Sequence, residues 1–176
     1  MTAPPTPQPD EKDWTWAITE SCPECGFDPR AVARSQVPEL IRSYTAQVLS
    51  ALARPDAPTR PSEKVWSPLE YGCHVRDVCR IFGGRLQLML TKDDPQFDNW
   101  DQDETALAGE YWTQDAKAVA AALESNADTL ADAFAQVEGD QWERPGRRSN
   151  GSVFTVDTFA RYLLHDLAHH VWDVRP

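Results

Sequence analysis

Two histidines, His165 and His169, are four residues apart in the last helical segment that the sequence predicts. Residues at positions i and i+4 share one face of an α-helix, with Cβ atoms about 5–6 Å apart, so both imidazoles can reach one ligand. A third histidine, His74, lies far upstream in another amphipathic segment. Neutral imidazole is the commonest protein ligand for zinc and its divalent neighbours. We therefore interpret His74, His165 and His169 as a metal site with an open coordination position.

The residues around these histidines suggest how such a site could be completed. His170 lies about 100° around the helix from His169, so we do not expect it to be a ligand. Asp77 or Asp173 could orient a ligand imidazole through its free N–H, and an exposed ion pair is the alternative for each. Further candidates for an anion-binding or pocket-lining role are Arg76, Arg80, Arg161, Tyr162 and Trp172. The alternative for each arginine is a solvated surface position.

The Cys22-Pro-Glu-Cys25 segment resembles half of a zinc-binding knuckle. A structural zinc site needs about four ligands, and no second Cys-x-x-Cys pair follows in the sequence. We therefore favour a tight turn carrying two thiols. Cys73 and Cys79 complete a set of four cysteines, which is too few for a disulfide scaffold, so we expect reduced thiols.

Composition limits the class of protein. The chain has 176 residues, of which 41% are hydrophobic, and this suits one globular domain with a substantial core. A net charge of −11 disfavours nucleic-acid binding. No apolar run approaches the roughly 18 residues that a membrane span needs, and residues 1–10 lack a signal-peptide pattern. We expect a soluble cytoplasmic protein, monomeric or homodimeric, that binds a small molecule.

The periodicity of apolar residues predicts four long helices. They extend over residues 37–52, from an N-cap at Ser67 to about residue 90, over about 25 residues after Thr113, and from near Thr155 to the end. Between them we expect a strand-like segment at 13–18, a helix start at Asp28-Pro29, an acidic connection at 92–110 and a turn at 143–151. Residues 1–12 are expected to be a disordered leader, and 13–176 a single all-α four-helix bundle.

Two segments resemble one known family. Residues 66–77, from Trp66 to Asp77, resemble the Trp-Ser-x-x-Glu-x-x-x-His segment of the DinB-like superfamily, and residues 164–170 resemble its closing His-x-x-x-His helix. The resemblance covers about residues 13–174. It implies an up-up-down-down four-helix bundle that holds a divalent metal through His74, His165 and His169. Some relatives have a carboxylate at the position of His165, and the all-histidine set suits zinc or nickel.

The resemblance also suggests an activity, because the superfamily includes mycothiol-dependent maleylpyruvate isomerases and related thiol S-transferases. We therefore expect a metal-dependent transferase in which a low-molecular-weight thiol, such as mycothiol, binds as thiolate and attacks a small electrophile. One alternative is a metal-dependent hydrolase of a small ester or amide. Another is a non-catalytic, small-molecule-binding stress-response bundle.

Overall fold

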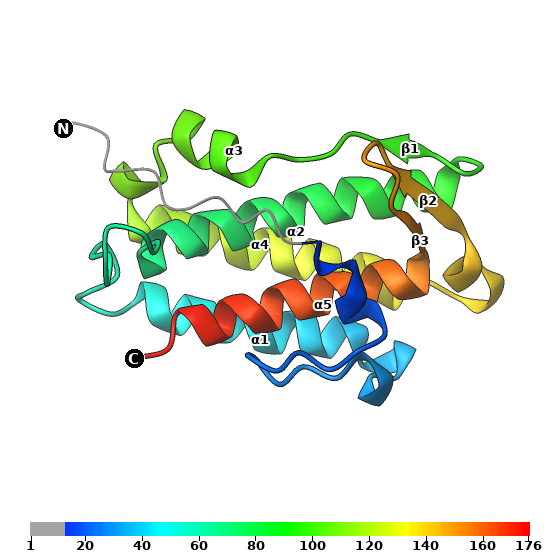
Figure 1. The fold of residues 1–176 in the computed structure, drawn as a ribbon, viewed down its shortest axis with the longest axis horizontal. Helices are drawn as coiled ribbons and strands as arrows, with labels where there is room; N and C mark the ends of the chain where they lie inside the picture. The colour runs from blue at the N-terminus through cyan, green and yellow to red at the C-terminus, as the bar shows by residue number, and fades with distance from the viewer. Residues whose placement is uncertain (1–12) are drawn as a thin grey trace.

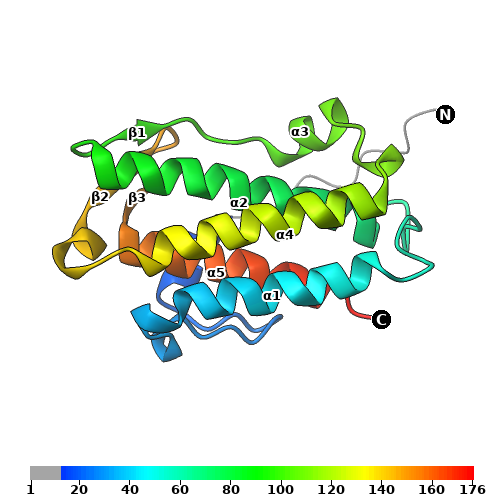
Figure 2. The ribbon, with the colours of Figure 1, turned by 180° about the vertical axis from the view of Figure 1, so that it is seen from behind.

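The computed structural model describes residues 13–176, and four long helices form its body (Figures 1 and 2). These helices are α1 (Val37–Leu52), α2 (Pro68–Thr91), α4 (Ala116–Ala135) and α5 (Val156–Asp173). Their bounds lie close to those expected from the sequence. The all-α four-helix bundle is therefore confirmed. The leader expected at residues 1–12 lies outside the described residues.

The start of α2 is fixed by a capping box. The Ser67 hydroxyl oxygen accepts a hydrogen bond from the Glu70 N–H, and the Glu70 carboxylate accepts one from the Ser67 N–H at 2.8 Å. Asp115 and Thr155 cap α4 and α5 in the same manner, each accepting from the N–H three residues on. These local signals explain why the helix starts could be predicted from the sequence.

The order of helix directions differs from the expected up-up-down-down. Helices α1 and α5 run one way and α2 and α4 the other, so the order is up-down-down-up (Figures 1 and 2). Asn126 on α4 bonds the Arg76 carbonyl of α2, and Leu130 lies beside Gly83, so the residue numbers of the two helices rise together. The reason is the long segment 92–115, which returns along the bundle before α4 begins. The expected order would need such a crossover between α1 and α2.

A small sheet covers one end of the bundle (Figure 1). Strand β1 (Gln96–Phe97) pairs in parallel with β2 (Pro145–Arg148), which pairs antiparallel with β3 (Val153–Thr155). A Cβ at Gly146 would come within 2.7 Å of the Met89 side chain, so glycine permits the close approach of β2 to α2. The hairpin replaces the turn expected at 143–151 and positions Arg148 at its end.

Three further segments differ from expectation. Residues Trp14–Ile18 form a 3-10 helix with Asp13 as its N-cap, where a strand-like segment was expected. The helix start at Asp28-Pro29 gives only a three-residue 3-10 helix, Pro29–Ala31. The acidic connection contains the short helix α3 (Gln102–Ala108), capped by Asp101. Short capped turns of this kind carry too little periodicity to be recognised from the sequence.

The core lies between the four helices. Phe82 of α2 stacks on Phe159 of α5 with ring centroids 4.6 Å apart, and Ile41, Leu123 and Leu163 are fully buried. Cys73 and Cys79 are also buried there as free thiols. None of the helices among residues 13–176 combines the length and the apolarity that a membrane crossing requires.

A buried ion pair joins the loop before α2 to that helix, and this contact can be tested. Arg60 donates to the Glu70 carboxylate, whose side chain is only 2% exposed. Burial alone would raise the Glu70 pKa, but hydrogen bonds from Arg60 and Ser67 lower it. Arg60→Ala should therefore reduce the free energy of unfolding by roughly 3–5 kcal/mol, measured by urea denaturation, because it strands a buried charge.

The matched control for this prediction is Arg42→Ala. Arg42 pairs with Asp128 and Asp132 across α1 and α4, but these partners are exposed. Its loss should cost no more than about 1 kcal/mol. Equal losses in the free energy of unfolding for the two variants would show that the buried ion pair of Arg60 and Glu70 stabilises the fold no more than an exposed one.

Candidate metal centre and cavity

Helix α5 carries two pairs of possible ligands, each four residues apart, on two different faces. Asp166 and His170 face α2, where their ligand atoms gather with those of His74. His165 and His169 gather instead with Cys22 and Cys25 of the N-terminal segment, by which we mean residues 13–36. In each group, every residue offers one nitrogen, oxygen or sulfur atom that lies within 4.8 Å of those offered by the others. We call these groups the His74 cluster and the Cys22 cluster.

The expected ligand set of His74, His165 and His169 is therefore divided between the two clusters. His170, which was not expected to be a ligand, stands beside His74 with ring centroids 4.6 Å apart. The cause is the rotation of about 100° per residue along a helix. The pair 165/169 therefore faces the N-terminal segment, and the pair 166/170, one residue further along α5, faces α2.

The His74 cluster is held in place by contacts on three sides. The His74 ring stacks on Trp100 with centroids 5.2 Å apart and planes nearly parallel. Nε2 of His170 lies 3.6 Å from the Asp166 carboxylate, and its Nδ1 lies 2.9 Å from the Asp173 carboxylate. Asp173 thus fixes the proton on Nδ1 and leaves Nε2 directed toward Asp166.

Burial and neighbouring charges determine the ionisation of the His74 cluster. Burial lowers the pKa of His74 to about 3, which keeps its imidazole neutral. Burial alone would also lower the pKa of His170, but Asp166 and Asp173 raise it to about 10. Burial would raise the pKa of Asp166, but the charge of His170 and its hydrogen bond lower it to about 2. The two shifts favour an imidazolium beside a carboxylate, and a divalent cation could replace the proton on Nε2 of His170.

Unpartnered buried atoms make the His74 cluster fit a metal ion. Both ring nitrogens of His74 and Oδ2 of Asp166 are buried without a hydrogen-bond partner among the described residues. A buried polar atom left unpaired costs about 1–3 kcal/mol, so such atoms call for an explanation. Two imidazoles and one carboxylate form a donor set that divalent metals such as zinc accept, with a position left open. A bound metal ion would give a partner to one ring nitrogen of His74 and to the Asp166 carboxylate.

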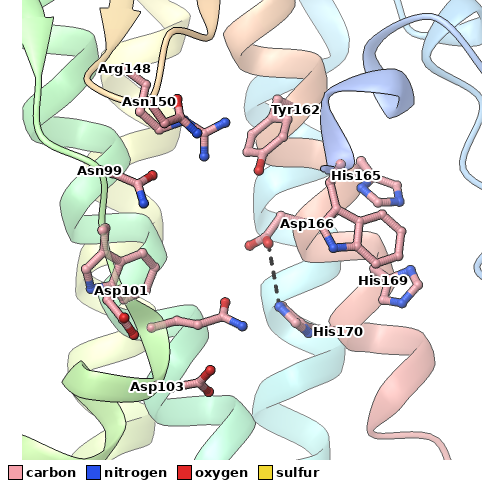
Figure 3. A pocket seen from close by; sticks show the side chains of 13 residues that line it. Asn99, Asp101, Asp103, Arg148, Asn150, Tyr162, His165, Asp166, His169 and His170 are labelled. Atoms are coloured by element: carbon pink, nitrogen blue, oxygen red, sulfur yellow. Dashed lines mark ion pairs between the residues drawn. The ribbon is translucent and has the colours of Figure 1, made fainter. Parts of the chain in front are cut away.

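Asp166 and His170 of the His74 cluster line a cavity of about 410 Å³, whereas His74 is not among its lining residues. Asp166, His170 and Tyr162 of α5 form one wall (Figure 3). The segment 92–115, which crosses the bundle between α2 and α4, forms the opposite wall with Asn99, Asp101 and Asp103. Arg148 and Asn150 of the hairpin lie at one end of the same space. The lining also includes Trp14, Trp100, Gln102, His165 and His169. This size is within the range of small-molecule sites.

Arg148 brings a guanidinium to the lining of the cavity, and sequence reasoning missed it. Its guanidinium lies over the rings of Tyr162 and Phe154, 5.3 and 5.5 Å from their centroids. Its Nε is buried without a hydrogen-bond partner among the described residues. The position depends on the hairpin after β2, which the helical periodicity of the sequence does not reveal.

The other expected pocket residues have different positions. Asp77 pairs with Arg76 and Arg80 and accepts a hydrogen bond from Tyr111, so the structure gives these groups an ion-pair role. Arg161 pairs with Asp157 and donates to the Pro29 carbonyl. Trp172 contacts His169, with centroids 5.6 Å apart, and borders a different hollow near Cys25. Tyr162 does line the cavity, and Asp173 orients His170.

The Cys22 cluster lies where the N-terminal segment crosses α5. Sγ of Cys22 is 3.7 Å from Nδ1 of His169. Burial lowers the pKa of His165 to about 4 and also lowers that of His169. Burial raises the pKa of the Cys25 thiol to about 11, although the backbone N–H of Phe27 acts in the opposite direction. This cluster was not expected from the sequence, where the cysteine pair had no visible partners.

The orientation of His170 by Asp173 can be tested with a metal that has little affinity for thiolates. Asp173→Ala should weaken Mn²⁺ binding by about 10- to 100-fold, measured by the EPR signal of the free ion, because the imidazole loses its fixed tautomer. Asp157→Ala is the matched control: it removes an equally buried α5 carboxylate that pairs with arginines. It should leave the affinity unchanged. A similar loss in both variants would refute the role of Asp173.

Comparisons with known proteins bear on the fold and the family of this chain. The chain resembles the solved structure of YfiT from Bacillus subtilis, described as a probable metal-dependent hydrolase with an unusual four-helix bundle topology. The TM-score is 0.73 at 16% identity, and the match covers 84% of this chain and 89% of that one. No curated protein sequence matches significantly. The family model of the DinB superfamily matches residues 39–174, so the chain belongs to the DinB superfamily.

Proposed function

We propose that this protein is a divalent-metal-dependent enzyme that uses the His74 cluster to join a low-molecular-weight thiol to a small electrophile. One observation carries the proposal: His74 and Asp166 have buried, unpartnered ligand atoms in one cluster with His170, and Asp166 and His170 line a cavity of small-molecule size. Structural sites are closed by protein ligands, whereas three protein ligands leave a position for a reactant. Membership of the DinB superfamily supports this assignment.

When bound there, a divalent ion supplies Lewis acidity and lowers the pKa of a coordinated thiol. The residues of this chain prepare the site for it. Asp173 holds the proton of His170 on Nδ1, so that Nε2 is free to act as a ligand. Trp100 covers the His74 ring and keeps water from it. Trp14 and Tyr162 add aromatic surface to the walls.

The rest of the lining suits polar reactants. The amide side chains of Asn99, Gln102 and Asn150 offer donors and acceptors for a hydroxylated thiol such as mycothiol. Arg148 lines the cavity, so its guanidinium is placed to bind the carboxylate of an electrophile. The thiol would lose its proton to solvent, and its sulfur would form a bond to the electrophilic carbon held between these groups while the electron pair of the bond broken at that carbon passes to the leaving group.

Hydrolysis of a small ester or amide is the second candidate. YfiT, which shares the fold, is described as a probable metal-dependent hydrolase. Asp101 and Asp103 line the cavity opposite α5, so a carboxylate that could act as a general base is present. We favour thiol transfer because the amide side chains that line the cavity suit a hydroxylated thiol and because the sequence resembles a superfamily with thiol-dependent members.

The two candidates are separated by assaying His74→Ala and the unmodified protein with the same substrates. Thiol adducts with a panel of electrophiles are measured by mass spectrometry, with mycothiol, bacillithiol or glutathione present. Chromogenic esters are assayed without thiol. We expect adduct formation that stops on metal removal, returns on metal addition, and falls at least 100-fold in His74→Ala without recovery. Adduct formation that survives metal stripping would refute the proposal, and thiol-independent ester cleavage would favour the hydrolase.

The role of Arg148 predicts a change in selectivity. Arg148→Gln should raise KM for a carboxylate-bearing electrophile by about 10- to 100-fold, because a hydrogen bond to a charged group contributes about 1.5–3 kcal/mol. KM for the uncharged ester of that electrophile should stay the same. Arg147→Gln is the control, since Arg147 is the adjacent residue but pairs with Asp94 at the surface. Equal KM increases for both electrophiles would argue against a direct contact.

A further inference from the structure

We infer that Cys22, Cys25, His165 and His169 form a second metal site, a structural Cys₂His₂ site suited to zinc that attaches the N-terminal segment to α5. The four residues come from two regions far apart in the sequence. The site is separate from the His74 cluster and shares none of its residues.

The spacing and the distances fit tetrahedral zinc. Cys-x₂-Cys combined with His-x₃-His is within the spacing of structural Cys₂His₂ sites. All four ligand atoms lie within 4.8 Å of one another. With zinc–sulfur bonds of about 2.3 Å and zinc–nitrogen bonds of about 2.0–2.1 Å, adjacent sulfur and nitrogen ligands should be about 3.6 Å apart. The separation of Cys22 Sγ and His169 Nδ1 is 3.7 Å.

The backbone around the cysteines forms a hydrogen-bonded turn. The Gly26 N–H donates to the Cys22 carbonyl at 2.9 Å, and the Cys22 N–H donates to the Phe27 carbonyl at 2.9 Å. Gly26 has φ +77°, in the left-handed region that favours glycine. This turn places Cys22 and Cys25 side by side opposite α5. The tight turn expected from the sequence is present, and it has a ligand-binding geometry.

Both imidazoles are prepared as ligands. His165 is buried and its Nε2 has no hydrogen-bond partner among the described residues. Nδ1 of His169 faces Cys22, while its Nε2 lies 3.5 Å from the Glu24 carboxylate. A carboxylate at the far nitrogen of a ligand imidazole is the usual outer contact of a zinc-bound histidine.

Aromatic side chains cover part of the Cys22 cluster. Trp14 packs 5.3 Å from the His165 ring and 4.9 Å from the His169 ring, measured between centroids. Trp16 and Phe27 lie about as far from His165, at 5.9 and 6.0 Å. Four protein ligands fill the tetrahedral coordination of zinc and leave no position for a substrate, which is the arrangement of a structural zinc. Because Trp14 also lines the cavity, this site would fix one part of the cavity wall.

Cobalt substitution tests this site without any assay of activity. Co²⁺ takes tetrahedral zinc positions, and thiolate ligands give it an intense sulfur-to-cobalt charge-transfer absorption that the sulfur-free His74 cluster cannot produce. We expect this band in the reduced protein, at one equivalent per chain. It should persist in His74→Ala, which separates this inference from the proposed function. It should be lost in Cys22→Ala/Cys25→Ala.

Cys79→Ala is the matched control, because it removes a buried thiol that is outside the cluster. The band should be unchanged in this variant. A second measurement needs no variant: zinc should slow the alkylation of Cys25 at least tenfold relative to chelated protein. Reduced protein with four titratable thiols that shows neither the band nor zinc protection would overturn the inference. So would a band retained in the double cysteine variant.

Discussion

The functional part of this protein depends on the rotation of helix α5. Each residue turns the chain by about 100°, so the overlapping pairs 165/169 and 166/170 face different neighbours. Asp166 and His170 meet His74 on α2, whereas His165 and His169 meet the cysteine turn. A single helix thus supplies ligand atoms to two clusters of different chemistry. Two nitrogens and a carboxylate suit a reactive metal, and two thiols with two imidazoles suit a structural one.

The crossover between α2 and α4 gives the first cluster an accessible side. Residues 92–115 return along the bundle, which makes α2 and α4 parallel and brings Trp100 and Asp101 opposite α5. The hairpin of β2 and β3 then closes one end with Arg148. The bundle provides rigid helices for the ligands, and the irregular segments provide the groups that would select a substrate. This division of roles is common in enzymes.

The fold was largely predictable because its signals are local. The capping box at Ser67 and the apolar periodicity of each helix fixed the helix positions within a few residues. Helix directions were not predictable in the same way, since they depend on which connection crosses the bundle. For the site, His74 could be identified, but the choice between pairs 165/169 and 166/170 depends on how α5 is rotated against α2. The sequence motif aligns the carboxylate of some relatives with His165. In this structure a carboxylate lies one residue further on, at Asp166, in the cluster with His74.

The two clusters are connected through the cavity wall. His165 and His169 line the cavity from one side of α5 while Asp166 and His170 line it from the other. Trp14 packs on the first pair and also borders the cavity, so the position of the N-terminal segment affects the shape of the space beside His74. That segment contributes only short 3-10 helices and has little core of its own. Ring contacts of Trp14 and the hydrogen bond from Arg161 to the Pro29 carbonyl attach it to α5, and the inferred zinc site would add a cross-link through four ligands on one cation.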